Sequence, residues 1–162
     1  MVDVGDSAPD FTAPCVDDGI EPVTLSNQLG DAPIVLAFFP AAFTGTCTEE
    51  MCTFRDRLAN FEDVGATVFG ISVDLPFTLE EFGRQHDLSF PLVSDPNHEL
   101  IHAYDVVDSF DDIGIDEIAR RSVFVVDDDG EVTYRWLADD PGNEPDYDEV
   151  REAAAAASVA AE

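Results

Sequence analysis

The sequence predicts an α/β fold in which a central mixed β-sheet lies between two layers of helices. Consecutive apolar residues at 34–39 have the pattern of a strand that is buried on both faces. Apolar residues then recur at helical spacing between Cys47 and Phe61. Strand-like and helix-like segments alternate along most of the remaining chain without a linker or repeat, so we expect one domain over residues 1–162.

The first predicted helix follows the 34–39 strand after a loop at residues 40–45. Thr46 and Glu49 have the Thr-x-x-Glu spacing of a capping box, which predicts Thr46 as the N-cap and Cys47 as the first helical residue. A single apolar stripe then runs to about residue 62, formed by Cys47, Met51, Phe54, Leu58 and Phe61. We therefore expect one helix whose stripe faces the core.

The later segments supply the remaining strands and helices. Four of them alternate in the order strand 66–73, helix 79–86, strand 90–93 and helix 96–104. Strand patterns at 122–126 and 131–137 flank an Asp-Asp-Asp-Gly turn, which is typical of a tight hairpin. Alanine-rich sequence from about Tyr147 predicts a final helix on the outside of the sheet.

The charge balance is strongly acidic. The chain carries 36 Asp and Glu residues against 7 basic residues, all of them arginine, which gives a formal net charge of −29. Such a surface repels phosphate backbones and anionic lipid headgroups, so we expect neither nucleic acid nor a membrane as a partner. The longest apolar run, at 34–43, is also shorter than the about 18 residues of a membrane helix. Molar salt shortens the Debye length to about 3 Å and screens the self-repulsion, which favours a halophilic origin.

The N-terminus and the cysteines indicate the compartment. The N-terminal residues are acidic where a secretory signal would be basic and then apolar, so we expect a cytoplasmic protein. Cys15, Cys47 and Cys52 are an odd number of cysteines in a chain long enough to fold without cross-links. We therefore expect reduced thiols and only a transient disulfide.

Cys47 is the first candidate for chemistry. Unpaired backbone N–H groups and the positive end of the helix dipole favour an anion at the start of a helix, so a thiol there is expected to ionise more readily than a free one. A cysteine on an apolar stripe with Met51 and Phe54 is equally consistent with a small core residue. Placement alone leaves both interpretations open.

The residues around Cys47 form a motif. Pro40, Thr44 and Cys47 have the spacing Pro-x-x-x-Thr-x-x-Cys, which resembles the active-site signature of the peroxiredoxins. The resemblance continues over most of the chain, at residues 5–11, 90–95, 103–106 and 121–124. It implies a thioredoxin-like three-layer sandwich and a thiol-dependent peroxidase that reduces hydrogen peroxide and organic hydroperoxides.

The resemblance implies a role for each matching residue. Cys47 would attack one peroxide oxygen, Thr44 would hydrogen-bond the peroxide and the thiolate, and Pro40 would shield the cysteine from water. Arg121 would supply positive charge, which agrees with the negative charge that develops on the leaving oxygen during O–O cleavage. Its neighbour Arg120 would point away from the pocket, because side chains alternate along a strand.

Glu50 and Cys52 receive supporting roles from the same resemblance. Glu50 matches an acidic residue of the family and would hold the arginine in place, although a carboxylate that complements the helix N-terminus explains it equally well. Cys52 matches the bacterioferritin-comigratory-protein type, in which a cysteine of the same helix resolves the sulfenic acid. The alternative is a one-cysteine enzyme in which an external thiol reduces Cys47. Cys15 has no matching role and is expected to be structural.

The resemblance also indicates the partners. It implies a peroxide substrate and a thioredoxin-like or small-thiol electron donor, with no cofactor and no metal ion. The family includes monomers, dimers and rings, so a homodimer is one expected assembly.

A zinc hydrolase is one competing function. The segment His98-Glu99-Leu-Ile-His102 matches the His-Glu-x-x-His motif, in which two histidines bind zinc and the glutamate is the general base. No third ligand is evident, because the next glutamate, Glu117, follows an aspartate-rich loop instead of a second helix. The sequence therefore favours an accidental match.

Two further functions would use the same scaffold. A thioredoxin-like thiol-disulfide reductase shares the strand-loop-Cys-helix arrangement, but the Cys-x-x-Cys pair is missing. A non-catalytic interaction module would require that Thr44 and Arg121 serve only folding. Consumption of peroxide distinguishes the peroxidase from both.

Overall fold

The computed structural model describes residues 2–160. Its strands are β1 (Thr12–Val16), β2 (Ile20–Thr24), β3 (Ile34–Phe38), β4 (Thr67–Ser72), β5 (Leu92–Ser94), β6 (Val107–Phe110), β7 (Ile115–Ala119), β8 (Ser122–Val126) and β9 (Val132–Leu137). Its α-helices are α1 (Gly45–Asp56), α2 (Leu58–Glu62), α3 (Pro76–Gln85), α4 (Glu99–Ala103) and α5 (Tyr147–Ala160). Two short 3-10 helices, η1 (Leu25–Asp31) and η2 (Asp111–Ile113), complete the order.

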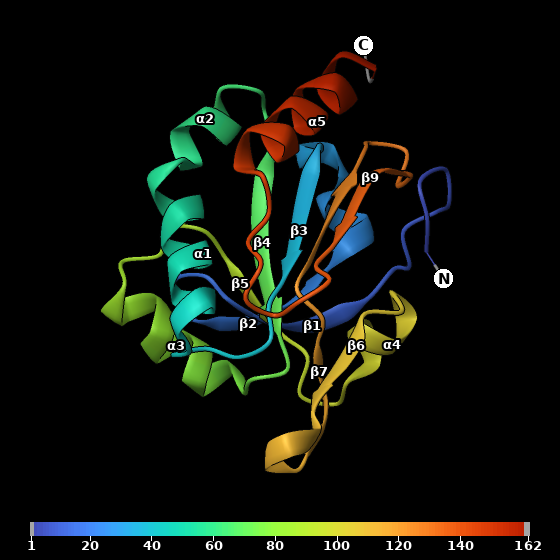
Figure 1. Ribbon diagram of the computed structural model, residues 1–162. Helices are drawn as coiled ribbons and strands as arrows, with labels where there is room; N and C mark the ends of the chain where they lie inside the picture. The colour runs from blue at the N-terminus through green and yellow to red at the C-terminus, as the bar shows by residue number, and fades with distance from the viewer. Residues whose placement is uncertain (1, 161–162) are drawn as a thin grey trace.

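One mixed sheet forms the centre of the molecule, with the strand order β2-β1-β5-β4-β3-β8-β9 (Figure 1). Strand β3 runs parallel to β4 and antiparallel to β8. Every residue of β3 is buried. Leu36 and Phe38 enter the hydrophobic cluster on one face of the sheet, and Val35 and Ala37 enter the cluster on the other. The prediction of a strand with two buried faces is therefore confirmed.

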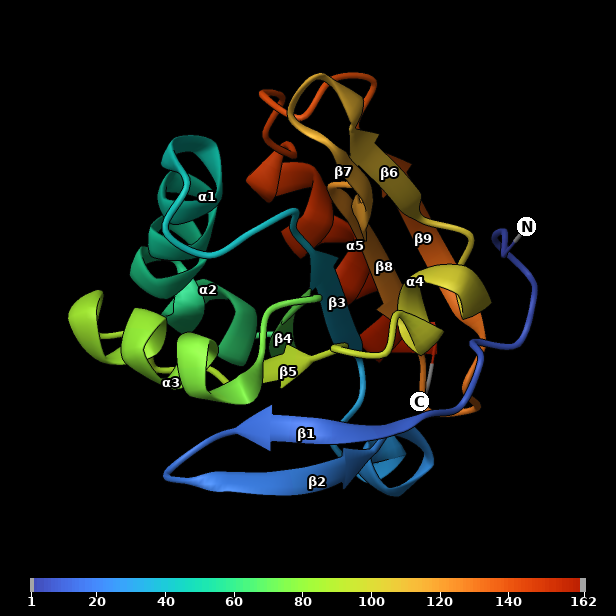
Figure 2. The same ribbon diagram turned by 90° about the horizontal axis from the view of Figure 1, so that it is seen from below.

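Helices cover both faces of the sheet. Figure 2 places α1, α2 and α3 on one side of β3 and α4 on the other. The first cluster contains Phe54 of α1, Phe82 of α3 and Val150 of α5, and the second contains Tyr104 after α4 and Phe124 of β8. The predicted α/β sandwich with a central mixed sheet is confirmed, and α5 is the predicted outer helix. Within residues 2–160, no helix combines the length and the apolar character needed to cross a membrane.

The apolar stripe after β3 packs against the sheet as predicted, but it belongs to two helices. The chain leaves helical geometry at Arg57 (φ −100°, ψ 5°), which separates α1 from α2. Gly70 of β4 allows α1 to approach closely, since a Cβ atom at that position would lie 3.0 Å from Met51 Sδ and 2.9 Å from Leu92 Cδ2. This close contact fixes the helix that carries Cys47.

Two antiparallel strand pairs escape the sequence analysis. In the β1–β2 hairpin Pro14 lies opposite Pro22, and prolines weaken a strand pattern because they cannot donate to the ladder. The β6–β7 ribbon is separate from the main sheet, and its polar, half-exposed residues carry little apolar alternation. Helix α3 also begins earlier than predicted, at Pro76, and α4 is shorter than predicted.

Candidate active site

Cys47 lies in the first turn of α1, but the helix begins earlier than the capping-box spacing predicts. The N-cap is Thr44, whose backbone is extended (φ −87°, ψ 156°), and Gly45 is the first helical residue. The N–H of Thr48 donates to the Thr44 carbonyl at 2.9 Å and closes the first turn. The prediction of Thr46 as the N-cap is therefore wrong, because Thr46 is already helical, and Cys47 is the third helical residue. Its N–H still belongs to the first turn, where the helix dipole favours negative charge.

Arg121 lies against this cysteine. It directly precedes β8, is 2% exposed, and donates from Nη2 to Cys47 Sγ at 3.2 Å. Arg120 points elsewhere, since its Nε donates to the Ala138 carbonyl at 2.9 Å. Of the two neighbouring arginines, Arg121 is therefore the one that faces the thiol.

Two further groups fix the orientation of the Arg121 guanidinium. Nη1 forms an ion pair with Glu50 Oε1 at 2.6 Å. Nε and Nη2 both donate to the carbonyl oxygen of Pro141, at 3.0 and 2.8 Å. Burial disfavours the charged guanidinium, but its electrostatic interactions and hydrogen bonds with Glu50 and Cys47 outweigh burial and raise the pKa of Arg121. The positive charge beside Cys47 is therefore stable.

Glu50 is fully buried within α1. One carboxylate oxygen pairs with Arg121, and Oε2 has no hydrogen-bond partner among residues 2–160. Burial raises the pKa of Glu50 to about 7, although Arg121 acts to lower it, and repulsion from Glu144 adds to the increase. This position corresponds to a carboxylate that holds the arginine, rather than to one that only complements the helix N-terminus at the surface.

The raised pKa of Glu50 is expected to make stability depend on pH. The folded protein binds this proton more tightly than the unfolded chain, so the contribution is complete below about pH 4.5 and is lost as the pH rises through about 7. Relative to Glu50→Gln, the free energy of unfolding of the wild type should fall by about 2–3 kcal/mol between about pH 5 and about pH 8. Urea unfolding of both proteins across this range measures the difference. If the free energies of unfolding of the two proteins change in parallel with pH, the raised pKa of Glu50 would be contradicted.

A small cavity of about 190 Å³ reaches the thiol. Its lining brings together residues from four parts of the chain, including Pro40, Thr44, Cys47, Phe110, Arg121 and Pro141. Cys47 itself is only 1% exposed, so a reagent reaches its sulfur through this cavity. The structure thus gathers the three motif residues and Arg121 around one narrow space.

Thr44 lines the cavity, but its hydroxyl does not bond to Cys47. Thr44 Oγ1 donates to the Ala41 carbonyl at 2.7 Å. The loop before α1 is anchored by Asp74, whose Oδ2 accepts from the N–H of Ala42 at 2.8 Å and from Ser72 Oγ at 2.7 Å. The sequence analysis missed Asp74, although its place just after a strand of the central sheet is a signal that could have found it.

The other two cysteines lie apart from the cavity. All three thiols are free, and Cys52 is half-buried further along α1. Cys15 is on β1 and enters the cluster on the opposite face of the sheet from Cys47. Burial, with the nearby charge of Asp17, raises the pKa of Cys15 to about 11, which keeps this thiol protonated at neutral pH. This placement fits the expected structural role of Cys15.

The His-Glu-x-x-His motif does not lie on one regular helix. His98 precedes α4 in a left-handed backbone conformation (φ 61°), and α4 has only five residues. Strand β7 folds back beside α4 and places Glu117 next to both histidines, but among the described residues only Asp127, Asp128 and Asp129 bring three such ligand atoms close enough together to share a cation. Glu117 Oε1 lies 2.9 Å from His98 Nδ1, and Oε2 lies 2.7 Å from His102 Nε2.

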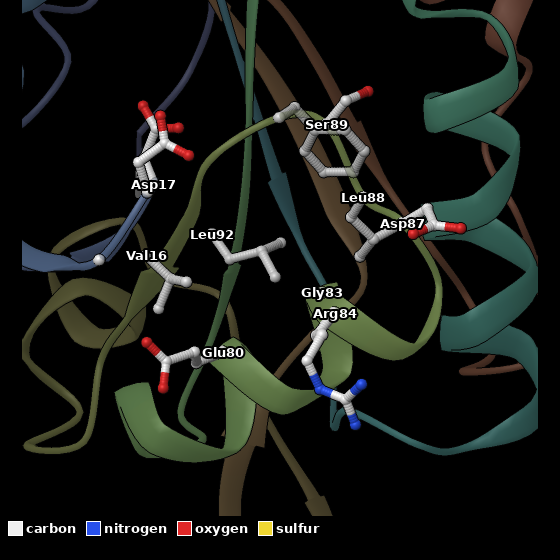
Figure 3. Close-up of a pocket in the computed structure, with 12 residues that line it drawn as sticks. Val16, Asp17, Glu80, Gly83, Arg84, Asp87, Leu88, Ser89 and Leu92 are labelled. Atoms are coloured by element: carbon white, nitrogen blue, oxygen red, sulfur yellow. The ribbon is translucent and has the colours of Figure 1, made fainter.

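A larger cavity lies elsewhere, between the β1–β2 turn and α3 (Figure 3). It has a volume of about 710 Å³, and its polar side chains are mainly acidic, including Asp17, Glu80 and Asp87. Arg84 at its edge is paired with Glu81. Neither Cys47 nor Arg121 contributes to its lining, so size alone does not identify the active site.

Comparison with known proteins identifies the family. A family model described as the AhpC/TSA family matches residues 4–135. The chain belongs to the peroxiredoxin family. Alkyl hydroperoxide reductase E of Mycobacterium tuberculosis is 38% identical over 136 residues, which cover 83% of this chain and 84% of that protein. Because peroxiredoxins are thiol-dependent peroxidases, this chain is an oxidoreductase, and the zinc-hydrolase and thiol-disulfide reductase alternatives are not favoured.

Solved structures agree with this peroxiredoxin assignment. The crystal structure of peroxidoxin BcpB from Mycobacterium tuberculosis superposes with a TM-score of 0.81 at 30% identity and covers 100% of this chain and 99% of that one. PrxQ of Xylella fastidiosa gives a TM-score of 0.81 at 25% identity, covering 94% of each chain. The predicted thioredoxin-like fold of this peroxiredoxin is therefore confirmed.

Proposed function

We propose that this peroxiredoxin reduces hydrogen peroxide and organic hydroperoxides at Cys47. The observation that carries the proposal is the contact of 3.2 Å between Arg121 Nη2 and Cys47 Sγ, at a helix N-terminus and beside a cavity of about 190 Å³. A guanidinium and the N–H groups of the first helical turn stabilise a thiolate, which is the nucleophilic form of cysteine. The small cavity suits hydrogen peroxide and narrow organic hydroperoxides.

In the proposed reaction the Cys47 thiolate attacks one oxygen of the peroxide. The S–O bond forms as the O–O bond breaks, the leaving oxygen takes a proton from solvent and departs as water or an alcohol, and Cys47 becomes a sulfenic acid. Arg121 stabilises the charge on the leaving oxygen. Thr44 turns its hydroxyl from the Ala41 carbonyl to the peroxide, and buried Pro40 keeps bulk water away from the sulfur.

Trapping of the sulfenic acid tests this proposal. Reduced protein is treated with hydrogen peroxide or ethyl hydroperoxide in the presence of dimedone, and the adduct is located by peptide mass mapping. We expect the adduct at Cys47 with both peroxides, together with loss of peroxide when dithiothreitol is supplied as donor. An adduct confined to Cys15 or Cys52 would overturn the assignment.

We further propose that Cys52 resolves the sulfenic acid through a transient disulfide. Both cysteines lie on α1, and Cα atoms five residues apart on a helix are roughly 8.6 Å apart, beyond the roughly 7 Å that a disulfide allows. The first turns of α1 must therefore unwind before the Cys52 thiolate can attack the Cys47 sulfur and release water. Glu50 lies between the two cysteines, so unwinding also breaks its ion pair with Arg121.

Cys52→Ser is expected to increase over-oxidation of Cys47. Without a resolving thiol the sulfenic acid persists and reacts with a second peroxide to give the sulfinic acid. Peptide mass mapping after graded peroxide doses should give a Cys47–Cys52 disulfide within one wild-type chain and sulfinic acid in the variant. Normal turnover in the variant, with no disulfide in the wild type, would indicate the one-cysteine mechanism instead.

The electron donor is proposed to be a thioredoxin-like dithiol protein or a small thiol that reduces the Cys47–Cys52 disulfide or the sulfenic acid. We propose that residues 1–162 act as one peroxiredoxin domain in the cytoplasm, where thiols stay reduced.

Exposed Phe43, Leu75 and Phe77 support a homodimer, because large apolar side chains at a surface favour contact with another copy. Sedimentation equilibrium measures that assembly.

We propose that the protein works in a high-salt cytosol. A net charge of −29 on 162 residues repels itself strongly in dilute buffer, and salt screens the repulsion. The free energy of unfolding is therefore expected to rise steeply between about 0.1 M and about 1 M KCl, where the Debye length falls from about 10 Å to about 3 Å. Urea unfolding at each salt concentration checks this. A urea midpoint that does not change with KCl concentration would contradict the halophilic proposal.

A further inference from the structure

The peptide bond between Pro141 and Gly142 carries the carbonyl that binds Arg121. Its oxygen accepts from both Nε and Nη2 of the guanidinium. Both residues of this peptide line the cavity at Cys47, where the segment between β9 and α5 passes the start of α1 (Figure 1). The orientation of one peptide plane in the cavity wall therefore helps to set the position of the guanidinium.

This peptide is the centre of a β-turn over residues 140–143. The N–H of Asn143 donates to the Asp140 carbonyl at 2.9 Å, with Pro141 and Gly142 between them. Turns with proline at the second position occur in two common forms, which differ by a flip of the central peptide, and one form needs a positive φ at the third position. Glycine at that position allows both forms. The structure has the form without a positive φ at Gly142.

A flip of this peptide would remove the acceptor from Arg121. The N–H and C=O groups of a trans peptide point in opposite directions, so the flip would turn the carbonyl away from the guanidinium and put an N–H donor in its place. Arg121 is 2% exposed, so water could not readily replace the lost acceptor. The arginine contact therefore requires the observed orientation of the 141–142 peptide.

Asp140 holds this orientation from the opposite edge of the peptide. Its Oδ1 accepts the N–H of Gly142 at 2.8 Å, while Arg121 donates to the carbonyl of the same peptide at 2.8 and 3.0 Å. A carboxylate, a peptide and a guanidinium thus form one chain of hydrogen bonds, in which each bond polarises the next. The flip would break the bonds on both edges of the peptide.

We propose that Asp140 is a positioning residue for the peroxidase reaction, because it fixes the 141–142 peptide that orients Arg121. The inference rests on the proposed role of Arg121 at Cys47. Asp140 does not belong to the cavity lining, so it acts through the arginine and not on the peroxide.

Stopped-flow measurement of sulfenic acid formation in Asp140→Ala tests the proposal. We expect the reaction with hydrogen peroxide to slow by about tenfold, because a hydrogen bond to a charged group contributes roughly this factor to an equilibrium. Asp140→Asn keeps an acceptor oxygen for the Gly142 N–H and should retain most of the wild-type rate. Asp139→Ala is the matched control, since fully exposed Asp139 carries the same charge but faces Arg120, at 3.9 Å. Its rate should equal that of the wild type.

A double variant shows whether Asp140 acts through the arginine. Adding Asp140→Ala to Arg121→Met should cause no further loss of rate, because a residue that only orients Arg121 then has nothing to orient. In heteronuclear NMR the Nε–H of Arg121 should exchange with solvent faster in Asp140→Ala than in Asp139→Ala, because its acceptor is no longer held in place.

The outcomes separate this inference from the role of Arg121 on which it rests. An Asp140→Ala rate equal to that of Asp139→Ala, with Arg121→Met slow, would overturn the inference alone. A loss of rate on Asp140→Ala that is equally large with and without Arg121 would also overturn it. If Arg121→Met keeps the wild-type rate, the proposed role of Arg121 fails and the inference fails with it.

Discussion

Replacing Cys47 with serine is expected to abolish peroxide reduction with every donor. The serine hydroxyl does not ionise usefully at neutral pH, whereas the thiol at this position has a helix N-terminus and Arg121 to stabilise its anion. The substitution changes one atom of a buried side chain, so the fold should be retained. The measurement is loss of hydrogen peroxide with dithiothreitol or thioredoxin as donor, compared at equal protein concentration.

Cys15→Ser is the matched control for this result. Cys15 is also buried, but it lies on the other face of the sheet, so its replacement should leave peroxidase activity intact. Thiol-dependent turnover that survives in Cys47→Ser and is lost in Cys15→Ser or Cys52→Ser would place the reactive sulfur elsewhere.

Arg121→Met is expected to slow the reaction of Cys47 with peroxide by about a hundredfold or more. Removing one preoriented hydrogen-bond donor that stabilises negative charge on a reacting oxygen typically slows a reaction by this factor. Arg120→Met is the control, because its guanidinium bonds to the Ala138 carbonyl and not to the thiol. Stopped-flow measurement of sulfenic acid formation separates this step from reduction by the donor.

Loss of Arg121 also leaves Glu50 buried without its partner. The already raised pKa of Glu50 means that the carboxyl will take up a proton, which limits the structural damage. The double variant Arg121→Met/Glu50→Gln avoids an unpaired buried carboxyl, since neither residue then carries charge. Equal rates in this double variant and the wild type would contradict the assignment of positive charge to the reaction, provided that circular dichroism confirms the fold.

The sequence could predict those parts of the fold that depend on local apolar patterns. The strand at 34–39 and the stripe through Met51 and Phe54 are buried as expected, because burial of apolar surface determines both. The β6–β7 ribbon could not be found in this way, since its strands are polar and pair with each other outside the main sheet. The helix start was misjudged because Thr44 and Thr46 both have the chemistry of an N-cap, and the loop after β3 decides between them.

The candidate site likewise combines residues that a local sequence pattern reveals with residues that only the folded chain brings together. The spacing of Pro40, Thr44 and Cys47 is a local pattern, so it could be recognised directly. Phe110 and Asp74 act through positions that only the folded chain brings near the cysteine. The pairing of Glu117 with His98 and His102 depends on the return of β7 beside α4, which no spacing in the sequence reveals.

The Arg121 guanidinium bonds to Cys47 and Glu50, and the carbonyl oxygen of Pro141 accepts its other two hydrogen bonds. This acceptor belongs to the backbone, so substitution of the side chain at this position leaves it in place and an alanine scan would pass over it. It also lies beyond residue 135, where the match to the family model ends. The segment between β9 and α5 must therefore keep its backbone path, whereas side chains other than that of Asp140 can vary. A redesigned or grafted active site that copied only the motif residues would therefore leave the arginine free to swing away from the sulfur.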